Sequence, residues 1–235
     1  SPIPVPMLRR GVTAAPALLP APPPAAHASV HPAPAADPRS RPLRRGRVVV
    51  AEDRLTRRPV ILWHASDGKV RVSRFDGAKW GAALVVPAGV SIPSLASINV
   101  TFEALDLSSD SQGRLHVIIS DGKKIYHLAE GKTGTWSAPQ VIGTIPKTSL
   151  TGLGLHLHMD GKDRVHVTYW YEAGIGYIRH AMRSGGSWSS WFDVGGGDGR
   201  HIDVAVGAAG DAHVVWVARN ANVGGLRNWQ GFYRG

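Results

Sequence analysis

The chain has 235 residues, a formal net charge of +10 and no cysteine. The lack of cysteine excludes disulfides and thiolate sites. No window approaches the roughly 18 consecutive apolar residues of a membrane-spanning helix, so the sequence also excludes that kind of segment.

Residues 1–47 form an arm whose composition differs from the rest of the chain. The arm holds 12 of the 17 prolines, seven arginines and one acid, Asp37, so it contributes about +6 of the net charge. Such a segment has little to bury and favours extended polyproline conformations. We expect a partner to bind the arm through its arginines, which are Arg9, Arg10, Arg39, Arg41, Arg44, Arg45 and Arg47.

The remaining residues, 48–235, repeat one phrase every 47 to 50 residues. The copies begin at Asp110, Asp160 and Gly207, and each reaches a His-Val pair six residues later. A weaker first copy has Asp53 at the Asp position and Pro59 where the histidine stands. The copies span roughly 48–92, 98–145, 151–196 and 200–235, and the last copy is short.

Each copy contains short alternating strands between Gly, Asp and Ser turns, without a helical apolar period. Leu115, Val117 and Ile119 fall on one side of such a strand and Ile118 on the other, so both sheet faces are apolar. Four strands in about 50 residues are typical of a propeller blade. The sequence therefore predicts an all-β fold: a β-propeller of about four four-stranded blades, open or incomplete, behind an extended arm.

Histidine and tryptophan recur with the repeat. His116, His166 and His213 share one position, His127 and His180 another, and Trp80, Trp136 and Trp188 a third. A residue repeated in every blade usually serves the blade, so we expect the first histidines to bond a neighbouring loop and the tryptophans to pack at turns. A metal ring of imidazoles is the alternative. We expect no metal and no cofactor, and no calcium at Asp198 or Asp203.

Aromatic residues outside the repeat register are the better candidates for contact with a ligand or partner. An exposed aromatic platform suits both a sugar face and a protein hot spot. These candidates are Trp63, Trp170, Tyr171, Trp191, Trp229 and Tyr233.

The pattern Asp-x-x-Gly-Arg-x-His-Val, x-Ile-x-His and Gly-x-x-Trp resembles the blades of secreted bacterial β-propellers of the sialidase-like, BNR-like superfamily. The resemblance runs from about Val48 to the C-terminus and leaves the arm unexplained. It implies the fold, whereas propellers of this kind include glycosidases, lyases, lectins and assembly scaffolds. The strict Asp-box is not met, because the stretch from Ser108 to Gly113 has one residue too many.

The blade count favours a non-catalytic role. Sialidase-like rings usually close with five to seven blades, so about four blades indicate a compact or open propeller, an oligomer that completes the ring, or part of a longer chain. An unclosed stack exposes an apolar face that something must cover. We therefore expect a binding or scaffolding subunit of a larger assembly, anchored by the arm. The alternatives are a carbohydrate-binding lectin and, less favoured, a glycosidase or polysaccharide lyase. Glu172 is the body's one glutamate beside a candidate tyrosine, Tyr171.

The expected partners are other protein subunits. An anionic membrane surface or an acidic protein would satisfy Arg44, Arg45 and Arg47 equally, and carbohydrate is an alternative ligand. We expect no nucleic acid, because the arm lacks the interleaved aromatics of a stacking surface. A start at Ser1 fits removal of a signal peptide, a proteolytic fragment or an incompletely known gene. The expected location is periplasmic or extracellular and peripheral to the membrane.

Overall fold

The computed structural model describes residues 48–90, 102–131, 134–146, 152–173, 175–196, 198–207, 211–223 and 226–234. All of them belong to one compact unit, Pro34–Gly235. The described residues contain seventeen β-strands and no α-helix. The arm and its seven arginines lie outside the described residues.

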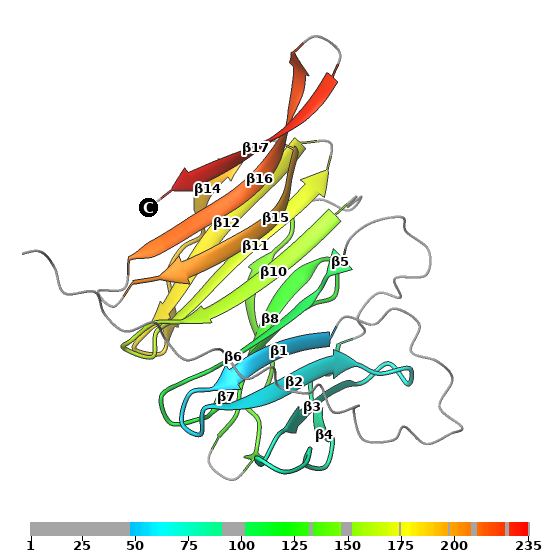
Figure 1. Ribbon diagram of the computed structural model, residues 1–235, viewed down its shortest axis with the longest axis vertical. Coiled ribbons are helices and arrows are strands. Elements are labelled where there is room, and N and C mark those ends of the chain that lie inside the picture. Colours follow the sequence, from blue (N-terminus) through cyan, green and yellow to red (C-terminus); the bar gives the residue numbers. More distant parts are fainter. Residues whose placement is uncertain are drawn as a thin grey trace, which may run out of the picture. The chain divides into compact units, whose positions relative to one another are not determined.

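The first two sheets are four-stranded antiparallel meanders. Their strands pair in chain order (Figure 1). Sheet 1 contains β1 (Val48–Asp53), β2 (Arg58–His64), β3 (Val70–Arg74) and β4 (Leu84–Val86). Sheet 2 contains β6 (Leu105–Ser109), β7 (Leu115–Ser120), β8 (Lys124–Ala129) and β9 (Gln140–Thr144).

The third and fourth sheets depart from four strands in opposite directions. Sheet 3 contains β10 (Gly152–Met159), β11 (Val165–Ala173), β12 (Ile175–Ser184), β13 (Ser187–Trp188) and β14 (Phe192–Gly196). It also receives β5 (Phe102–Glu103), which pairs in parallel with β10. Sheet 4 pairs three strands: β15 (Asp198–Val206), β16 (Ala212–Val223) and β17 (Leu226–Arg234).

The repeat predicted the all-β fold and the succession of four sheets, and the structure confirms both. One detail of the alignment is wrong. His116 lies opposite Ser108, and the matching strand position in sheet 1, Ala51, lies opposite Val60. The turn after Asp53 is one residue longer than its counterparts, so Val60 rather than Pro59 occupies the histidine position.

The first strand of each sheet lies beside the first strand of the next. β1 contacts β6, β6 contacts β10, and β10 contacts β15, as can be followed in Figure 1. The three buried hydrophobic clusters fill the spaces between consecutive sheets. For each sheet we call the face towards the preceding sheet the leading face and the opposite one the trailing face.

Alternation along single strands supplies both faces. Val117 and Ile119 belong to the cluster shared with sheet 1, whereas Ile118 between them belongs to the cluster shared with sheet 3. Tyr169 packs towards sheet 2, and its neighbour Trp170 packs towards sheet 4. Since strand side chains alternate between faces, one strand holds a sheet against two neighbours.

Candidate functional site

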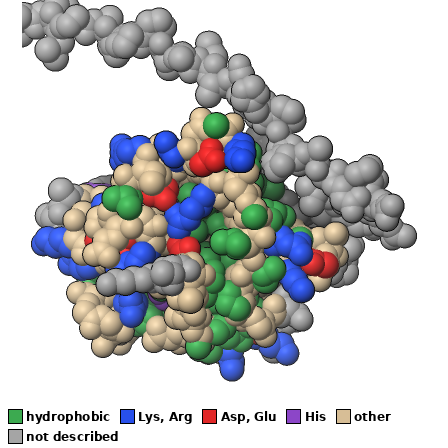
Figure 2. Space-filling model, turned by 90° about the horizontal axis from the view of Figure 1, so that it is seen from below, with side chains coloured by type: hydrophobic (Ala, Val, Ile, Leu, Met, Phe, Trp, Pro, Cys, Tyr) green, Lys and Arg blue, Asp and Glu red, His purple; other side chains and the backbone are tan. Residues whose placement is uncertain are grey.

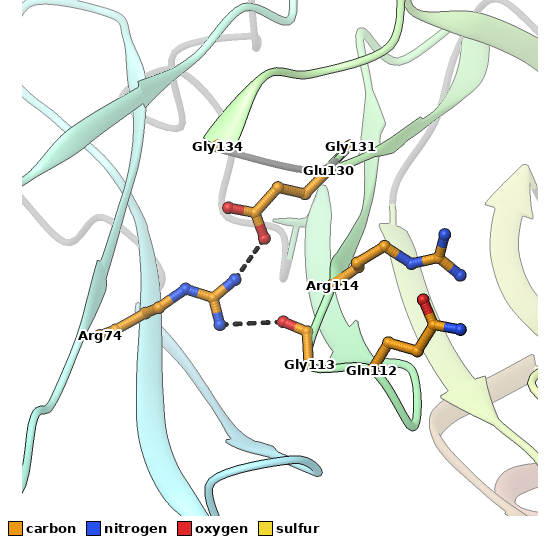
Figure 3. A pocket seen from close by; sticks show the side chains of 7 residues that line it. All are labelled: Arg74, Gln112, Gly113, Arg114, Glu130, Gly131 and Gly134. Carbon is orange, nitrogen blue, oxygen red and sulfur yellow. Dashed lines mark hydrogen bonds and ion pairs between the residues drawn. The ribbon is translucent and has the colours of Figure 1, made fainter.

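An open pocket of about 410 Å³ lies at the boundary of sheets 1 and 2 (Figure 3). Arg74 reaches it from the end of β3, and Glu130 from the residue after β8. The other lining residues are Gln112, Gly113, Arg114, Gly131 and Gly134. Figure 3 shows Arg74 pointing towards Glu130, while Arg114 and Gln112 point to the other side. The lining is therefore polar and charged.

Arg74 ties the two sheets together in this pocket. Its Nη1 donates to Asp53 Oδ2 at 2.5 Å and to the carbonyl oxygen of Gly113 at 3.1 Å, and its Nη2 donates to Glu130. Glu130 also accepts the backbone NH of Leu115 at 3.1 Å. Both carboxylates are buried, and a shared guanidinium compensates their charges. The pocket thus offers fixed hydrogen-bonding groups rather than an exposed acid or base.

The turn that opens each repeat is held by an aspartate in the second and third copies. Asp160 Oδ1 accepts the backbone NH groups of Lys162 and Arg164, each at 2.8 Å, and its Oδ2 accepts Arg164 Nε at 2.5 Å. Asp110 makes the same contacts with Gln112 and Arg114. Burial of the Asp160 carboxyl opposes its ionisation, but these hydrogen bonds outweigh burial and lower the pKa to about 2.

The repeated histidines form pairs across neighbouring strands. His116 Nδ1 lies 3.1 Å from His127 Nε2, and His166 Nδ1 lies 3.2 Å from His180 Nε2. The Nε2 of each first histidine also lies near the turn carboxylate of its own repeat, 3.6 Å for His166 and Asp160 and 3.8 Å for His116 and Asp110, which is longer than a hydrogen bond. The expected loop is therefore close to these histidines, but the imidazole of the neighbouring strand makes the hydrogen bond. One ring must donate and the other accept, so a pair with both rings protonated cannot keep this bond.

Burial keeps the paired histidines neutral. It lowers the pKa of His127 to about 3, with His116 and Arg183 adding to the effect. The pKa of His180 falls to about 4 through burial and the nearby His166. The repeat therefore places neutral imidazole pairs inside the structure, which serve its packing.

The fourth copy differs from the second and third at two positions of this turn, yet it keeps a carboxylate beside its histidine. Gly207 replaces the usual Asp, and Asp211 stands where Arg114 and Arg164 stand. Asp211 Oδ2 lies 2.5 Å from His213 Nε2. A Cβ at position 207 would lie 2.6 Å from the Asp211 carboxylate, so the glycine leaves the space that this carboxylate fills.

Polar contacts also join the sheets outside the pocket. Arg54 in the first turn donates its backbone NH to Ser109 Oγ at 2.7 Å and its Nη1 to the carbonyl oxygen of Asp160 at 3.0 Å. Asp106 Oδ2 accepts the backbone NH of Leu157 at 2.7 Å. Because these contacts connect sheets 1, 2 and 3, they favour a rigid body.

The predicted contact aromatics fall into different environments. Trp170 and Tyr171 are buried between sheets, which corrects the expectation that they form an exposed platform. Trp191 is part-buried, and its Nε1 donates to the carbonyl oxygen of Ile142 at 2.8 Å. For Trp229 and Tyr233 the structure describes only the backbone, within β17.

The in-register tryptophans pack at turns, as the repeat predicts. Trp80 bridges to Phe75 and Trp136 to Glu130, while Trp188 pairs with Arg183. Trp136 packs against the cluster between sheets 1 and 2, and Trp188 meets His127 edge-on with ring centroids 5.4 Å apart.

Among the candidate aromatics whose side chains the structure describes, Trp63 is the one that lies on an uncovered sheet face. It lies part-buried on the leading face of sheet 1, opposite Val48 in the register. Val48, Val50 and Val85 on this face are exposed. Figure 2, a view from the end where β3 and β4 lie in Figure 1, shows hydrophobic side chains gathered between charged ones.

Sequence reasoning missed the pocket. Arg74 and Glu130 are 56 residues apart, and neither belongs to a motif that would have marked it. Among the described residues, no three His, Cys, Asp or Glu side chains are grouped to hold a metal ion. Within the same ranges, no helix is long and apolar enough to span a membrane.

No protein-family model matches the sequence, and no curated protein matches it at a significant level. Among solved structures, AofleA from Arthrobotrys oligospora is similar, with a TM-score of 0.46 at 13% sequence identity. The match covers 63% of this chain and 42% of that one, so this chain corresponds to less than half of AofleA.

Proposed function

We propose that the chain is a non-catalytic binding subunit with a propeller-like body, which joins a larger exported assembly through its sheet faces and its basic arm. One observation carries this proposal. The leading face of sheet 1 presents exposed Val48, Val50 and Val85 beside Trp63. Contiguous exposed apolar surface of this kind marks interaction sites.

The non-catalytic part of the proposal is supported by how the conspicuous polar residues are used. The Asp160 carboxylate closes a turn, and the His127 and His180 imidazoles bond their neighbours. In the pocket, Asp53 and Glu130 both pair with Arg74. These side chains stabilise turns and sheet boundaries, and a rigid body of this kind suits docking without rearrangement.

The arm would bind by folding onto an acidic surface of the partner. The test compares the full chain with a variant that lacks residues 1–47, by the fraction retained in the complex that co-purifies with the native protein. We expect the deletion to reduce retention strongly. A second comparison separates charge from length: glutamine at Arg44, Arg45 and Arg47 should weaken retention more than lysine at the same positions. Unchanged retention after the deletion would contradict the role of the arm.

The pocket supports a second candidate function, carbohydrate binding. A guanidinium, a carboxylate, an amide and backbone groups around an open hollow are the fixed polar groups that orient a sugar's hydroxyls. The test is a glycan array with the full chain, repeated with Gln112→Ala, which removes an exposed lining side chain. A ligand whose signal falls in Gln112→Ala supports this function, and an array without any ligand contradicts it.

A further inference from the structure

The chain makes the same kind of contact between consecutive sheets, always a trailing face against a leading face. The cluster between sheets 1 and 2 contains Leu62 and Val72 from a trailing face and Leu107 from a leading face. Ile118 meets the leading face of sheet 3, and Trp170 that of sheet 4. Such head-to-tail contacts leave one unused face at each end of a series.

The unused leading face belongs to sheet 1, and its residues match buried residues in the other sheets. When the repeats are aligned on their turns, Val50 corresponds to Leu107 and Leu157. Val50 is 66% exposed, whereas Leu107 is 4% and Leu157 7% exposed. Val48, at the position of Leu105, is 52% exposed, compared with 2% for Leu105. These valines stand where a preceding sheet would cover them.

The unused trailing face belongs to sheet 4, and it shows the same difference. Val215 takes the place of Ile118 and is 46% exposed, whereas Ile118 is fully buried. His213 takes the place of His116, and its side chain is 39% exposed against 8% for His116. The two ends of the series therefore offer the two halves of the contact that the chain makes internally.

The exposed valines on the leading face of sheet 1 suit an apolar partner rather than a charged one. The charged side chains beside it are paired within the chain, Glu52 with Arg57 at 2.7 Å and Arg71 with Asp67 at 2.8 Å. What remains is an apolar sheet face with Val48, Val50 and Val85 beside Trp63. Inside the molecule, the surface that packs on such a leading face is the trailing face of a like sheet.

We propose that a second copy of this chain covers these faces, with the trailing face of sheet 4 in one copy packed on the leading face of sheet 1 in the next. This assembly is head-to-tail, so it closes into a ring when the rotation per copy permits it. The inference deepens the proposed function and rests on it, since it names the protein partner of the same apolar face.

The test measures the mass of the full chain in solution by light scattering during size-exclusion chromatography, at concentrations up to about 100 µM, where contacts of micromolar affinity are populated. The wild type is expected to be an oligomer. Val50→Asp and Val215→Asp should each reduce the assembled fraction at least about tenfold, because a charge would be buried in the contact. The matched control is Val141→Asp, a strand valine of similar exposure on β9, which should leave the mass unchanged.

Mixing the two variants identifies the head-to-tail arrangement. Val50→Asp keeps an intact sheet 4 and Val215→Asp an intact sheet 1, so the mixture should form a dimer that neither variant forms alone. A monomeric wild type overturns the proposal, and so does a mixture that stays monomeric. Association that appears only after residues 1–47 are deleted overturns it too, because the arm would then be the occupant of the face.

The proposed function fails in a different way. A wild-type chain that is monomeric but still co-purifies with another protein overturns self-association and leaves the binding role intact. A circular dichroism melt of each variant checks that loss of assembly is not loss of fold.

Discussion

Sheets 2 and 3 lie between neighbours, whereas sheets 1 and 4 lie at the ends of the series, and the same repeat behaves differently in the two settings. At the position shared by Leu107 and Val50, the inner sheet has a buried leucine and the terminal sheet an exposed valine. At the first histidine position, the inner copies bury His116 and His166, whereas the side chain of the terminal His213 is 39% exposed. A repeat position therefore acquires its energetic role from the neighbour that covers it.

The largest difference between inner and terminal sheets should appear when equivalent side chains are truncated. Leu107→Ala is expected to cost about 2–5 kcal/mol, because it removes buried atoms and leaves a cavity. Val50→Ala should cost less than about 1 kcal/mol in the isolated chain. Urea unfolding at a concentration where the chain is monomeric measures both. Equal losses would show that the two faces are equally covered.

Removal of the turn carboxylate should separate the inner and terminal copies next. Asp160→Ala leaves two backbone NH groups and the guanidinium of Arg164 without their acceptor, so we expect a loss of about 2–4 kcal/mol. Asp211→Ala should cost less, because solvent can replace the exposed carboxylate. The shift of the urea midpoint in each variant checks the order, and a larger loss for Asp211→Ala would contradict it.

The third comparison concerns the packing of Trp216 on Gly195 between sheets 3 and 4 and the equivalent positions of sheets 1 and 2. A Cβ at Gly195 would lie 2.7 Å from Trp216 Cζ2, and sheet 1 has Val86 at the position of Gly195. Sheet 2 correspondingly has Ile119 where sheet 4 has Trp216. Gly195→Ala is expected to cost about 1–3 kcal/mol through overpacking.

The double variant with Trp216→Ile tests that explanation. If the two side chains compete for one space, the double variant should lose less stability than the two single losses added together. Strict additivity in thermal or urea unfolding would exclude the contact as the cause.

Acid should also lower the free energy of unfolding, and per pH unit this is the smallest of the expected effects. The folded pKa of His127, about 3, and of His180, about 4, lie below the ordinary value of 6.5, so unfolding takes up protons between these limits. The contribution of the two histidines is full above pH 6.5 and falls as the pH decreases, by on the order of 1 kcal/mol per pH unit for each. Urea unfolding from pH 7 to pH 4.5 measures the slope.

Sheet 1 supplies the control for this pH dependence. It has Val60 and Val72 where sheet 2 has His116 and His127. The double variant His116→Val with His127→Val should therefore flatten the slope. An unchanged slope would assign the acid sensitivity to other groups.

The sequence predicts the sheets well because their signals are local. Alternation around Val117 and the turn at Asp110 each involve a few consecutive residues, and they recur with the repeat. The pocket and the ties between sheets are not local: Arg74 meets Glu130, and Arg54 meets Asp160, only because two sheets come together. The residue pattern within one copy does not indicate which residues of the next copy it contacts.

The aromatic candidates show a second limit. Neither Trp170 nor Trp63 occupies the tryptophan position that recurs with the repeat, yet Trp170 is buried and Trp63 lies at an uncovered face. The sequences of the two strands do not distinguish the two cases, because exposure depends on whether a following or preceding sheet covers the residue. Pairing of histidines was likewise hidden, because it requires the register that places β7 beside β8.

Cross-linking tests most directly whether the two terminal faces are the unused halves of one contact. The chain has no cysteine, so Val50→Cys in one preparation and Val215→Cys in another introduce unique thiols. Under mild oxidation the mixture should yield a 50–215 disulfide dimer in excess of 50–50 and 215–215 dimers, because only facing residues come within about 7 Å. Val141→Cys in place of Val50→Cys should yield little. A mixture in which the 50–215 dimer is no more abundant than this control would contradict the account.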